Sequence, residues 1–290
     1  MKIGAHVSAS GGLDKAIDRA QEIGAECVQM FASGPQSWAF KPVSEDNIIA
    51  FRTKVEETGI WPNFLHGIYL VNLGSPQTEN LSRSQGALVN YLNVASQIGA
   101  QGVIFHSGSH KGAGFDFVFK QTVERLNEVL ERSPNNAQLI IENCAGMGNQ
   151  IGASFVEIGR ILKALGNSRV KVCLDTQHSF AAGYDVVTKE GLNRTLEEFD
   201  QEIGLEHLVA IHANDSKIPF GGGVDRHENI GEGNIGTVGF EVMLANPAFQ
   251  NIPFLLEVPG TERSGPDRDN VNRLKAIREN VVLSASENRC

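Results

Sequence analysis

The sequence predicts an α/β fold, a (β/α)8 TIM barrel, formed as a single domain by residues 1–290. Short apolar runs alternate with helical patterns along the whole chain. Several of these runs are continuously β-branched or leucine-rich, as in parallel strands that are covered on both faces. No linker or low-complexity stretch interrupts the alternation. A length of 290 residues also lies within the range that α/β barrels occupy as one unit.

Eight candidate strands follow one another, at residues 2–6, 26–30, 61–65, 102–105, 138–141, 169–174, 207–211 and 253–256. Between them apolar residues recur at helical spacing. Ser44 and Ser154 precede two such stretches as N-caps, and Gly59 and Gly99 follow two others, where C-cap glycines belong. The alternative is an open doubly wound sheet, but no G-x-G-x-x-G motif follows the first strand.

The composition restricts the class of protein and its location. The formal net charge of −9 has the wrong sign for a protein that simply coats nucleic acid, although three divalent cations would reduce it to −3. The four cysteines form no C-x-x-C pair, so we expect free thiols, a reducing compartment and a cytoplasmic protein. We expect no membrane association, because there is no long apolar run and the N-terminus reads as a strand, not as a signal peptide.

Polar side chains that can bind metal stand at the ends of the predicted strands. Six strands end in such a residue: His66, His106, Glu142, Asp175, His212 and Glu257. A seventh candidate, His178, lies three positions after Asp175. Active sites of these barrels form at the carboxyl ends of the strands. A single histidine or aspartate there is more often structural. Six together would be costly to bury without a cation, so the pattern predicts a metal site.

A polar loop after the seventh strand adds two candidates. Asp225 and His227, at positions i and i+2 of an extended segment, point the same way and could bind one ion. The structural alternative is a solvated polar loop with glycine hinges. Mixed histidine and carboxylate ligands suit zinc, manganese or iron better than calcium.

At these positions the sequence resembles the endonuclease IV family of apurinic-site DNA repair nucleases. The motifs occur in family order across nearly the whole chain: GAHVS at 4–8, YLVNLG at 69–74, FHSGSH at 105–110, IEN at 141–143, LDTQH at 174–178, FAAGYD at 180–185, HANDSK at 212–217, VDRH at 224–227, IGEG at 230–233 and LE at 256–257.

The resemblance implies a trinuclear site of divalent ions, most simply zinc, with manganese or iron possible at one or more positions. It assigns one ion to His66, His106 and Glu142, a second to Glu142, Asp175, His212 and Glu257, and a third to His178, Asp225 and His227. Glu142 would bridge two ions that also hold the nucleophilic water as hydroxide. The implied reaction is hydrolysis of the phosphodiester on the 5′ side of abasic sites, with 3′-phosphatase and 3′-phosphodiesterase activity. The implied partner is double-stranded DNA with abasic sites or blocked 3′ ends, and we expect a monomer.

The resemblance also suggests substrate contacts and supporting residues. Tyr69 and Leu70 match the positions of a minor-groove wedge beside a flipped abasic nucleotide. Further residues are expected at the DNA or behind the ligands: Gln36, Lys217 and Arg226 as DNA contacts, and His6, His110 and Asn72 as supports of the ligands.

The chain departs from the family pattern in the segment 31–38, which carries no charge, with Gln36 where the family has a basic residue. Gly221–Gly223 stands where a Ser-Arg pair is common, and Cys144, Ala213 and Val258 replace residues beside the ligands. The hypothesis is intact chemistry with weaker DNA engagement. The alternatives are a metal-dependent sugar isomerase or epimerase on the same barrel, which would need one or two ions and not the third group, and a weakly active lesion-binding relative.

Overall fold

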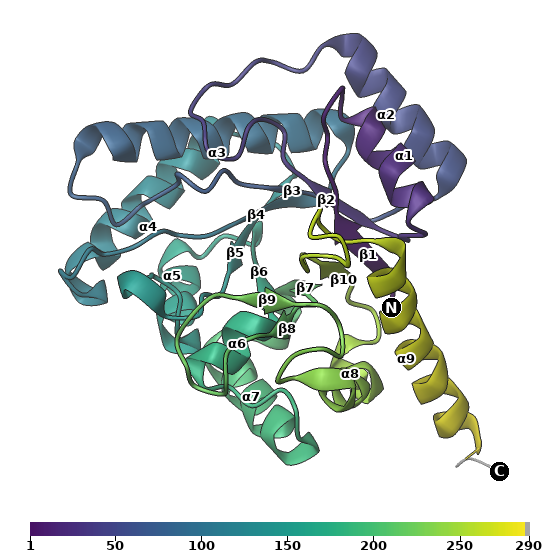
Figure 1. Ribbon diagram of the computed structural model, residues 1–290. Coiled ribbons are helices and arrows are strands. Elements are labelled where there is room, and N and C mark those ends of the chain that lie inside the picture. Colours follow the sequence, from purple (N-terminus) through teal and green to yellow (C-terminus); the bar gives the residue numbers. More distant parts are fainter. Residues whose placement is uncertain (288–290) are drawn as a thin grey trace.

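The computed structural model describes residues 1–287 and confirms the predicted barrel (Figure 1). Eight parallel strands close in the order β1-β2-β3-β4-β5-β6-β7-β10. They are β1 (Ile3–His6), β2 (Val28–Met30), β3 (Asn63–His66), β4 (Gly102–Phe105), β5 (Gln138–Glu142), β6 (Val170–Asp175), β7 (Leu208–His212) and β10 (Phe254–Leu256). Residues 288–290, including Cys290, lie outside the described part.

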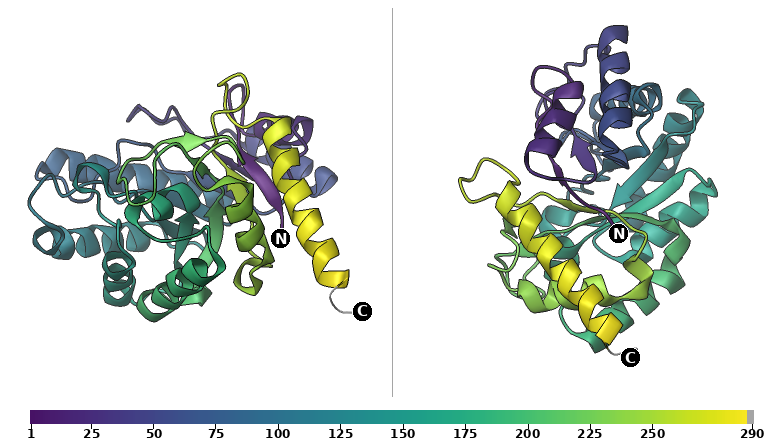
Figure 2. Two further views of the ribbon diagram at one scale, coloured as in Figure 1. Left: turned by 60° about the horizontal axis from the view of Figure 1, so that its bottom comes forward. Right: turned by 90° about the vertical axis from the view of Figure 1, so that its right-hand side faces the viewer.

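Helices surround the barrel and carry the chain from one strand to the next (Figure 2). They are α1 (Asp14–Glu22), α2 (Glu45–Thr58), α3 (Thr78–Ile98), α4 (Phe115–Arg132), α5 (Phe155–Leu165), α6 (Thr176–Ala182), α7 (Lys189–Glu202), α8 (Gly236–Ala245) and α9 (Arg268–Glu287). The expected caps are present: Ser44 and Ser154 accept a hydrogen bond from the third backbone amide of α2 and α5, and Gly59 and Gly99 end α2 and α3 in the left-handed region.

Two strands begin two residues later than the sequence predicts. The ladder of β2 starts at Val28, not at residue 26, because Glu26 lies below the barrel, where its carboxylate accepts from the Ile3 amide and pairs with Arg278. Strand β3 starts at Asn63, since Trp61 is followed by Pro62, which has no N–H to donate to a ladder.

The interior of the barrel is filled by one apolar layer whose members alternate with outward-facing residues. It consists of Cys27, Phe64, Ile104, Ile140, Cys173, Ala210 and Leu255, all fully buried. Successive side chains of a strand point to opposite faces. The residue two positions beyond each member of this layer therefore also points inward, one step closer to the carboxyl end. The fold thereby fixes which side chains meet at the barrel mouth.

A small hairpin of β8 (Asp215–Ser216) and β9 (His227–Glu228) covers part of that mouth. The fully buried carboxylate of Asp215 accepts hydrogen bonds from the backbone amides of Gly231, Gly233, Ile235 and Gly236. A Cβ at Gly233 would lie 2.5 Å from Asp215 Oδ1, so only glycine allows this close approach. The loop after β7 is thus fixed over the strand ends.

Two of the expectations drawn from composition can be examined in the described residues. Cys27, Cys144 and Cys173 are free and buried. Within residues 1–287, every helix is too short or too polar to cross a membrane.

Candidate metal centre at the barrel mouth

Each barrel strand contributes one inward-pointing polar side chain within one residue of its carboxyl end. We call these eight residues the rim layer: His6, Gln29, His66, His106, Glu142, Asp175, His212 and Glu257. Seven of them lie two positions after a member of the apolar layer, and His6 lies two positions after Gly4, as the pleat requires. Five of them are almost completely buried, namely Gln29, His66, Glu142, Asp175 and His212. The layer brings together every strand-end residue that the sequence singled out.

The polar atoms of this layer and its neighbours form three overlapping groups with metal-ligand composition. Within each group the potential ligand atoms lie within 4.8 Å of one another: His66, His106 and Glu142; Glu142, Asp175, His212 and Glu257; and Asp175, His178 and His227. Glu142 belongs to the first two groups and Asp175 to the last two. Up to three neighbouring ions could therefore share carboxylates.

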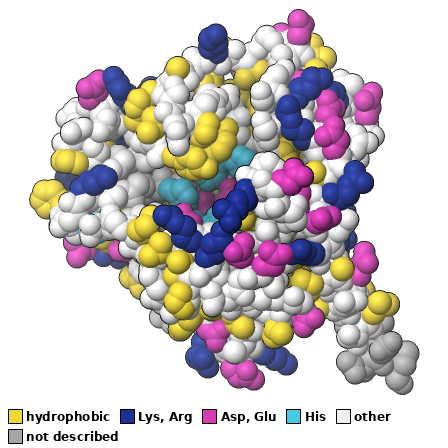
Figure 3. Space-filling model, in the orientation of Figure 1, with side chains coloured by type: hydrophobic (Ala, Val, Ile, Leu, Met, Phe, Trp, Pro, Cys, Tyr) yellow, Lys and Arg dark blue, Asp and Glu magenta, His cyan; other side chains and the backbone are white. Residues whose placement is uncertain are grey.

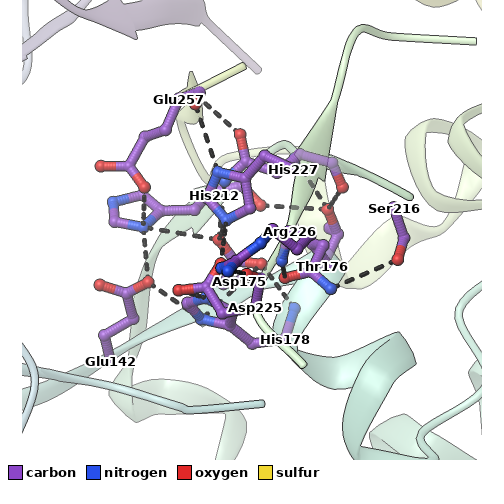
Figure 4. A network of polar contacts seen from close by, with 12 residues as sticks. Glu142, Asp175, Thr176, His178, His212, Ser216, Asp225, Arg226, His227 and Glu257 are labelled. Atoms are coloured by element: carbon purple, nitrogen blue, oxygen red, sulfur yellow. Dashed lines mark hydrogen bonds and ion pairs between the residues drawn. The ribbon is translucent and has the colours of Figure 1, made fainter. Parts of the chain in front are cut away.

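Asp225 completes the third group. Its Oδ2 lies 3.3 Å from His178 Nε2, and its Oδ1 lies 3.3 Å from His227 Nε2 (Figure 4). His178 sits in the first turn of α6, immediately after β6, whereas Asp225 and His227 come from the loop that β9 holds over the mouth. The residues that the sequence analysis grouped thus meet in space. Asp175 approaches the same group, with Oδ2 at 3.7 Å from His227 Nε2.

Hydrogen bonds to one ring nitrogen orient the imidazoles of the centre. Three of them place Nδ1 against a backbone carbonyl: His66 on Gly67 (2.7 Å), His178 on Asn143 (2.9 Å) and His227 on Glu257 (3.2 Å). Such a bond fixes the ring and leaves the lone pair of the other nitrogen free for a cation. In each of the three, that nitrogen is Nε2.

The other two imidazoles have different partners. In His212 the roles of the two nitrogens are exchanged: Nε2 bonds Gln29 Oε1 at 2.8 Å, and Nδ1 faces Glu142 Oε1 at 2.9 Å. His106 places Nδ1 3.4 Å from the thiol of Cys144 and Nε2 3.4 Å from Glu142 Oε2. Burial raises the pKa of the Cys144 thiol to about 12, so the thiol is neutral and a weak partner.

The charged groups of the centre lie close enough to shift one another's pKa values. Burial disfavours the charged form of each group, but nearby opposite charges outweigh it and hold the pKa of Glu142 well below its usual value. Burial likewise opposes charge on His178 and His212. The pKa of His178 is nevertheless raised well above normal by the surrounding carboxylates, and that of His212 by Cys173 and the carboxylates of Glu142 and Glu257. Asp225 behaves as Glu142 does: burial opposes its charge, but the neighbouring His178 lowers its pKa to about 2.

The donor set fits divalent cations. The Nε2 atoms of His178 and His227 are buried without a hydrogen-bond partner, and both face the Asp225 carboxylate. Buried polar atoms without partners are costly, and ionised carboxylates with neutral imidazoles are the state in which these side chains bind metal. Mixed nitrogen and oxygen donors suit zinc, manganese and iron.

Two buried asparagines support the ligands and had no assigned role at the sequence level. Asn143 accepts from the Asp175 amide at 2.7 Å. Asn214 donates to Asp175 Oδ2 at 2.7 Å and accepts from the Glu257 amide at 2.8 Å, so it joins two strand ends. Each follows a predicted ligand by one or two positions, and that spacing is the only signal for them in the sequence. Gln29 of the rim layer was missed as well.

Of the three residues expected to support the ligands, one contacts a ligand and two hold the surrounding loops. His6 contacts the centre directly, with Nδ1 3.3 Å from Glu257 Oε1. His110 accepts a hydrogen bond from the Gly114 amide within its own loop. Asn72 accepts from the backbone amides of Gly74 and Ser109 and thereby connects two loops of the mouth.

The residues expected at DNA lie around the opening. The Tyr69 side chain is 60% exposed and packs edge-on against Phe31, with ring centroids 5.3 Å apart, whereas Leu70 is partly buried against the core. Gln36, Lys217 and Arg226 are exposed. Figure 3 shows histidines at the floor of a hollow that is bordered by hydrophobic and positively charged side chains.

A groove of about 1120 Å³ extends from the centre across the mouth. It is lined by the segments that follow β1, β2 and β10, and it reaches His6, His227 and Glu257. Lys41 and Arg263 are the cations on its walls. A polymer lying in this groove would pass directly beside the metal-ligand groups.

The fold and these ligand groups define a metal-binding barrel, and comparison with known proteins specifies which. The model of the xylose isomerase-like TIM barrel family matches residues 17–281. Similar proteins include the probable endonuclease 4 of Halothermothrix orenii, 38% identical over 93% of this chain and 96% of that protein, and that of Aquifex aeolicus, 36% identical over 97% and 99%. The crystal structure of endonuclease IV from Thermus thermophilus is similar with a TM-score of 0.86, at 32% identity, covering 97% and 100%.

The chain therefore belongs to the endonuclease IV family of the xylose isomerase-like TIM barrels. A D-tagatose 3-epimerase-like protein is also similar, with a TM-score of 0.74 over 100% of both chains, but at 17% identity this shows the fold alone.

Proposed function

We propose that this protein is a DNA repair endonuclease that hydrolyses the phosphodiester on the 5′ side of abasic sites and also removes phosphate and phosphodiester groups from blocked 3′ ends. The observation that carries the proposal is the overlap of three metal-ligand groups in one buried layer. Membership of the endonuclease IV family supports the same reaction. The substrate is double-stranded DNA, bound by a monomer.

We assign the ligands to three divalent ions, most simply zinc, in agreement with the grouping that the family motifs suggest. The first ion takes His66, His106 and Glu142, the second Glu142, Asp175, His212 and Glu257, and the third His178, Asp225 and His227. Bound cations of this kind supply Lewis acidity, which lowers the pKa of water to near neutrality and neutralises charge on a phosphodiester.

Glu142 has the position that a shared ligand needs. Its side chain is fully buried, with Oε2 3.2 Å from His66 Nε2 and Oε1 2.9 Å from His212 Nδ1. The lowered pKa keeps the carboxylate ionised at neutral pH. Glu142 would therefore contribute to both the first and the second ligand group.

The rim of the mouth would bind the substrate. Tyr69 and Leu70 stand above His66, where an exposed aromatic ring with an apolar neighbour can fill the gap left by a missing base. Lys217 and Arg226 are paired across the β8–β9 hairpin by a backbone hydrogen bond and can contact phosphates. Gln36 lies on the same side of the mouth as Tyr69, since Pro35 accepts from the Tyr69 amide.

The buried free thiols of Cys27, Cys144 and Cys173 are consistent with a reducing compartment, and we propose that the protein acts in the cytoplasm. The third ligand group argues against a sugar isomerase on the same barrel. Such an enzyme uses one or two metal ions and would not need a third set of ligands.

Incision of a duplex oligonucleotide with one abasic analogue tests the proposal. We expect cleavage on the 5′ side of the lesion, abolished by a chelator and restored by added zinc or manganese. Glu142→Gln should lose at least about 10³-fold in rate, because a single electrostatic contact in an active site is already worth about 10²–10³-fold. An intact duplex of the same sequence is the substrate control. Binding without turnover would indicate a lesion-binding relative, and epimerisation of a ketose without incision would indicate the sugar enzyme.

A further inference from the structure

Gln29 is the one member of the rim layer that is neither a carboxylate nor an imidazole. It lies in β2 with its side chain fully buried, among groups that all belong to the candidate metal centre. A buried amide must find partners for two N–H donors and one carbonyl oxygen. Gln29 finds all of them within the centre, so its position is determined by the ligands around it.

The hydrogen bonds of Gln29 determine which way its amide faces. Its Nε2 lies 2.6 Å from Glu257 Oε1 and 2.9 Å from His6 Nδ1. An ionised carboxylate can only accept, so the NH₂ group must face Glu257. The carbonyl Oε1 then faces His212 Nε2 at 2.8 Å. Rotating the amide by 180° would place Oε1 against the carboxylate and leave both unpaired.

This orientation selects the tautomer of His212. A carbonyl oxygen can only accept, and therefore the neutral imidazole, the form that binds metal, carries its proton on Nε2. The lone pair is left on Nδ1, which lies 2.9 Å from Glu142 Oε1 and 3.3 Å from Glu257 Oε2, on the side of the second ligand group. His212 is thus the reversed member of the centre, and Gln29 is the residue that reverses it.

The same amide holds a second ligand of that group. Glu257 Oε1 is occupied by Gln29 Nε2 and also lies 3.3 Å from His6 Nδ1. Its other oxygen is directed toward His212 Nδ1. One side chain from β2 therefore orients ligands from two different strands, β7 and the end of β10.

We propose that Gln29 is a positioning residue for the ion assigned to Glu142, Asp175, His212 and Glu257, fixing His212 as an Nδ1 ligand and directing Glu257 Oε2 toward the same ion. The proposal rests on the proposed function, since it assumes that this group binds metal. Removing a partner of this kind typically weakens metal binding about 10- to 100-fold.

The test is metal retention in Gln29→Met, which keeps the length of the side chain and removes its three hydrogen bonds. Zinc-loaded protein is titrated with a competing chelator, and bound zinc is counted by native mass spectrometry. We expect one ion to be lost at about 10- to 100-fold lower chelator concentration than in the wild type, while the remaining ions keep their affinity. The matched control is Gln85→Met, which removes a buried glutamine that bonds Glu128 far from the ligands. Wild-type retention of every ion in folded Gln29→Met would overturn the proposal.

A second measurement uses the wild type and does not depend on the variant folding. Long-range ¹H–¹⁵N correlation of the zinc-loaded protein reports which nitrogen of each metal-bound imidazole is protonated. We expect His212 to carry its proton on Nε2 and His66, His178 and His227 to carry theirs on Nδ1. A His212 ring protonated on Nδ1 would contradict the proposal. Absence of bound zinc in the wild type would instead contradict the proposed function, so the two failures are distinguishable.

Discussion

The rim layer and the segment 31–38 border the same opening but are built in opposite ways. Every member of the rim layer sits within one residue of the carboxyl end of a ladder-paired strand, so its position is set by the pleat of the barrel. The segment 31–38 has no regular structure, and Gln36 is exposed at its tip. Its ties to the body include hydrogen bonds from Ser33 to Tyr91 and from the Tyr69 amide to Pro35.

The two regions also differ in charge. The rim layer concentrates ionisable groups in a buried space, whereas the segment 31–38 carries none. Cations for a phosphate backbone come from elsewhere, among them Lys41 and Arg263 on the groove walls. The difference indicates that the chemistry is fixed by the strands, while the strength of DNA binding is left to loops that can change without disturbing it.

After Glu142→Gln, the largest loss of activity is expected from a change in the third ligand group. Asp225→Asn should lose about 10²–10³-fold in incision rate, because one charged ligand beside the reacting phosphate is removed. It should also bind one ion fewer. Incision kinetics and metal content measure both. Glu232→Gln is the control, since Glu232 lies in the same loop but pairs with Arg273 on the surface. Equal losses in the two variants would show that the loop as a whole, and not the ligand, matters.

The charged rim layer should make the metal-free protein sensitive to pH. The pKa values of His66, His178 and His212 are raised, despite burial, by their carboxylate neighbours and, at His212, first by Cys173. Groups with raised pKa stabilise the fold fully below their unfolded value of about 6.5, and this stabilisation is lost as the pH rises through the folded values, by up to about 1.4 kcal/mol per imidazole and pH unit.

The unfolding temperature of chelator-treated protein should therefore fall as the pH rises above about 6.5, the unfolded imidazole pKa, and through the raised folded values. The unfolding temperature of metal-loaded protein should not fall in this way, because bound cations take the place of the protons on the imidazoles. The difference in unfolding temperature between metal-loaded and metal-free protein, measured by differential scanning calorimetry, should increase with pH. A difference that is constant or decreases as the pH rises would argue against ions in the rim layer.

The uncharged segment predicts a moderate effect on DNA binding. Gln36→Arg should raise affinity for an abasic duplex several-fold and steepen the dependence of log affinity on log salt by about one unit, as expected for one added phosphate contact. Gel-shift titration across salt concentrations measures both quantities, with Gln36→Met as the uncharged control. Affinity and slope equal to the wild type would mean that the segment lies away from the DNA.

The smallest effect is expected behind His106. Cys144→Thr replaces a thiol by a hydroxyl, which is a better acceptor for the Nδ1 proton. A neutral hydrogen bond contributes about 1 kcal/mol, so the ion at His106 should bind about fivefold more tightly. Competition with a chelator measures this, and Cys144→Ala should shift the affinity the other way. Identical affinities in both variants would show that this contact does not tune the ion.

The strand ends were predictable because a parallel barrel brings them together whatever the loops do, and so His66 and Glu142 could be placed in one site from the sequence. Gln29 could not be found in this way, since a glutamine carries no charge and no metal-ligand signature. Its signal was positional: it follows Cys27 at the same two-residue spacing that relates Ile140 to Glu142. The role of Asn214 depends on contacts between three strand ends, which no local pattern encodes.

The central claim is that the barrel mouth holds three metal ions in overlapping ligand groups. Counting the metal bound per chain, by native mass spectrometry of protein dialysed against limiting zinc at neutral pH, tests it most directly. We predict three ions in the wild type and a stable two-ion species in His227→Ala. A wild-type protein that retains a single ion would contradict the claim and favour the isomerase class.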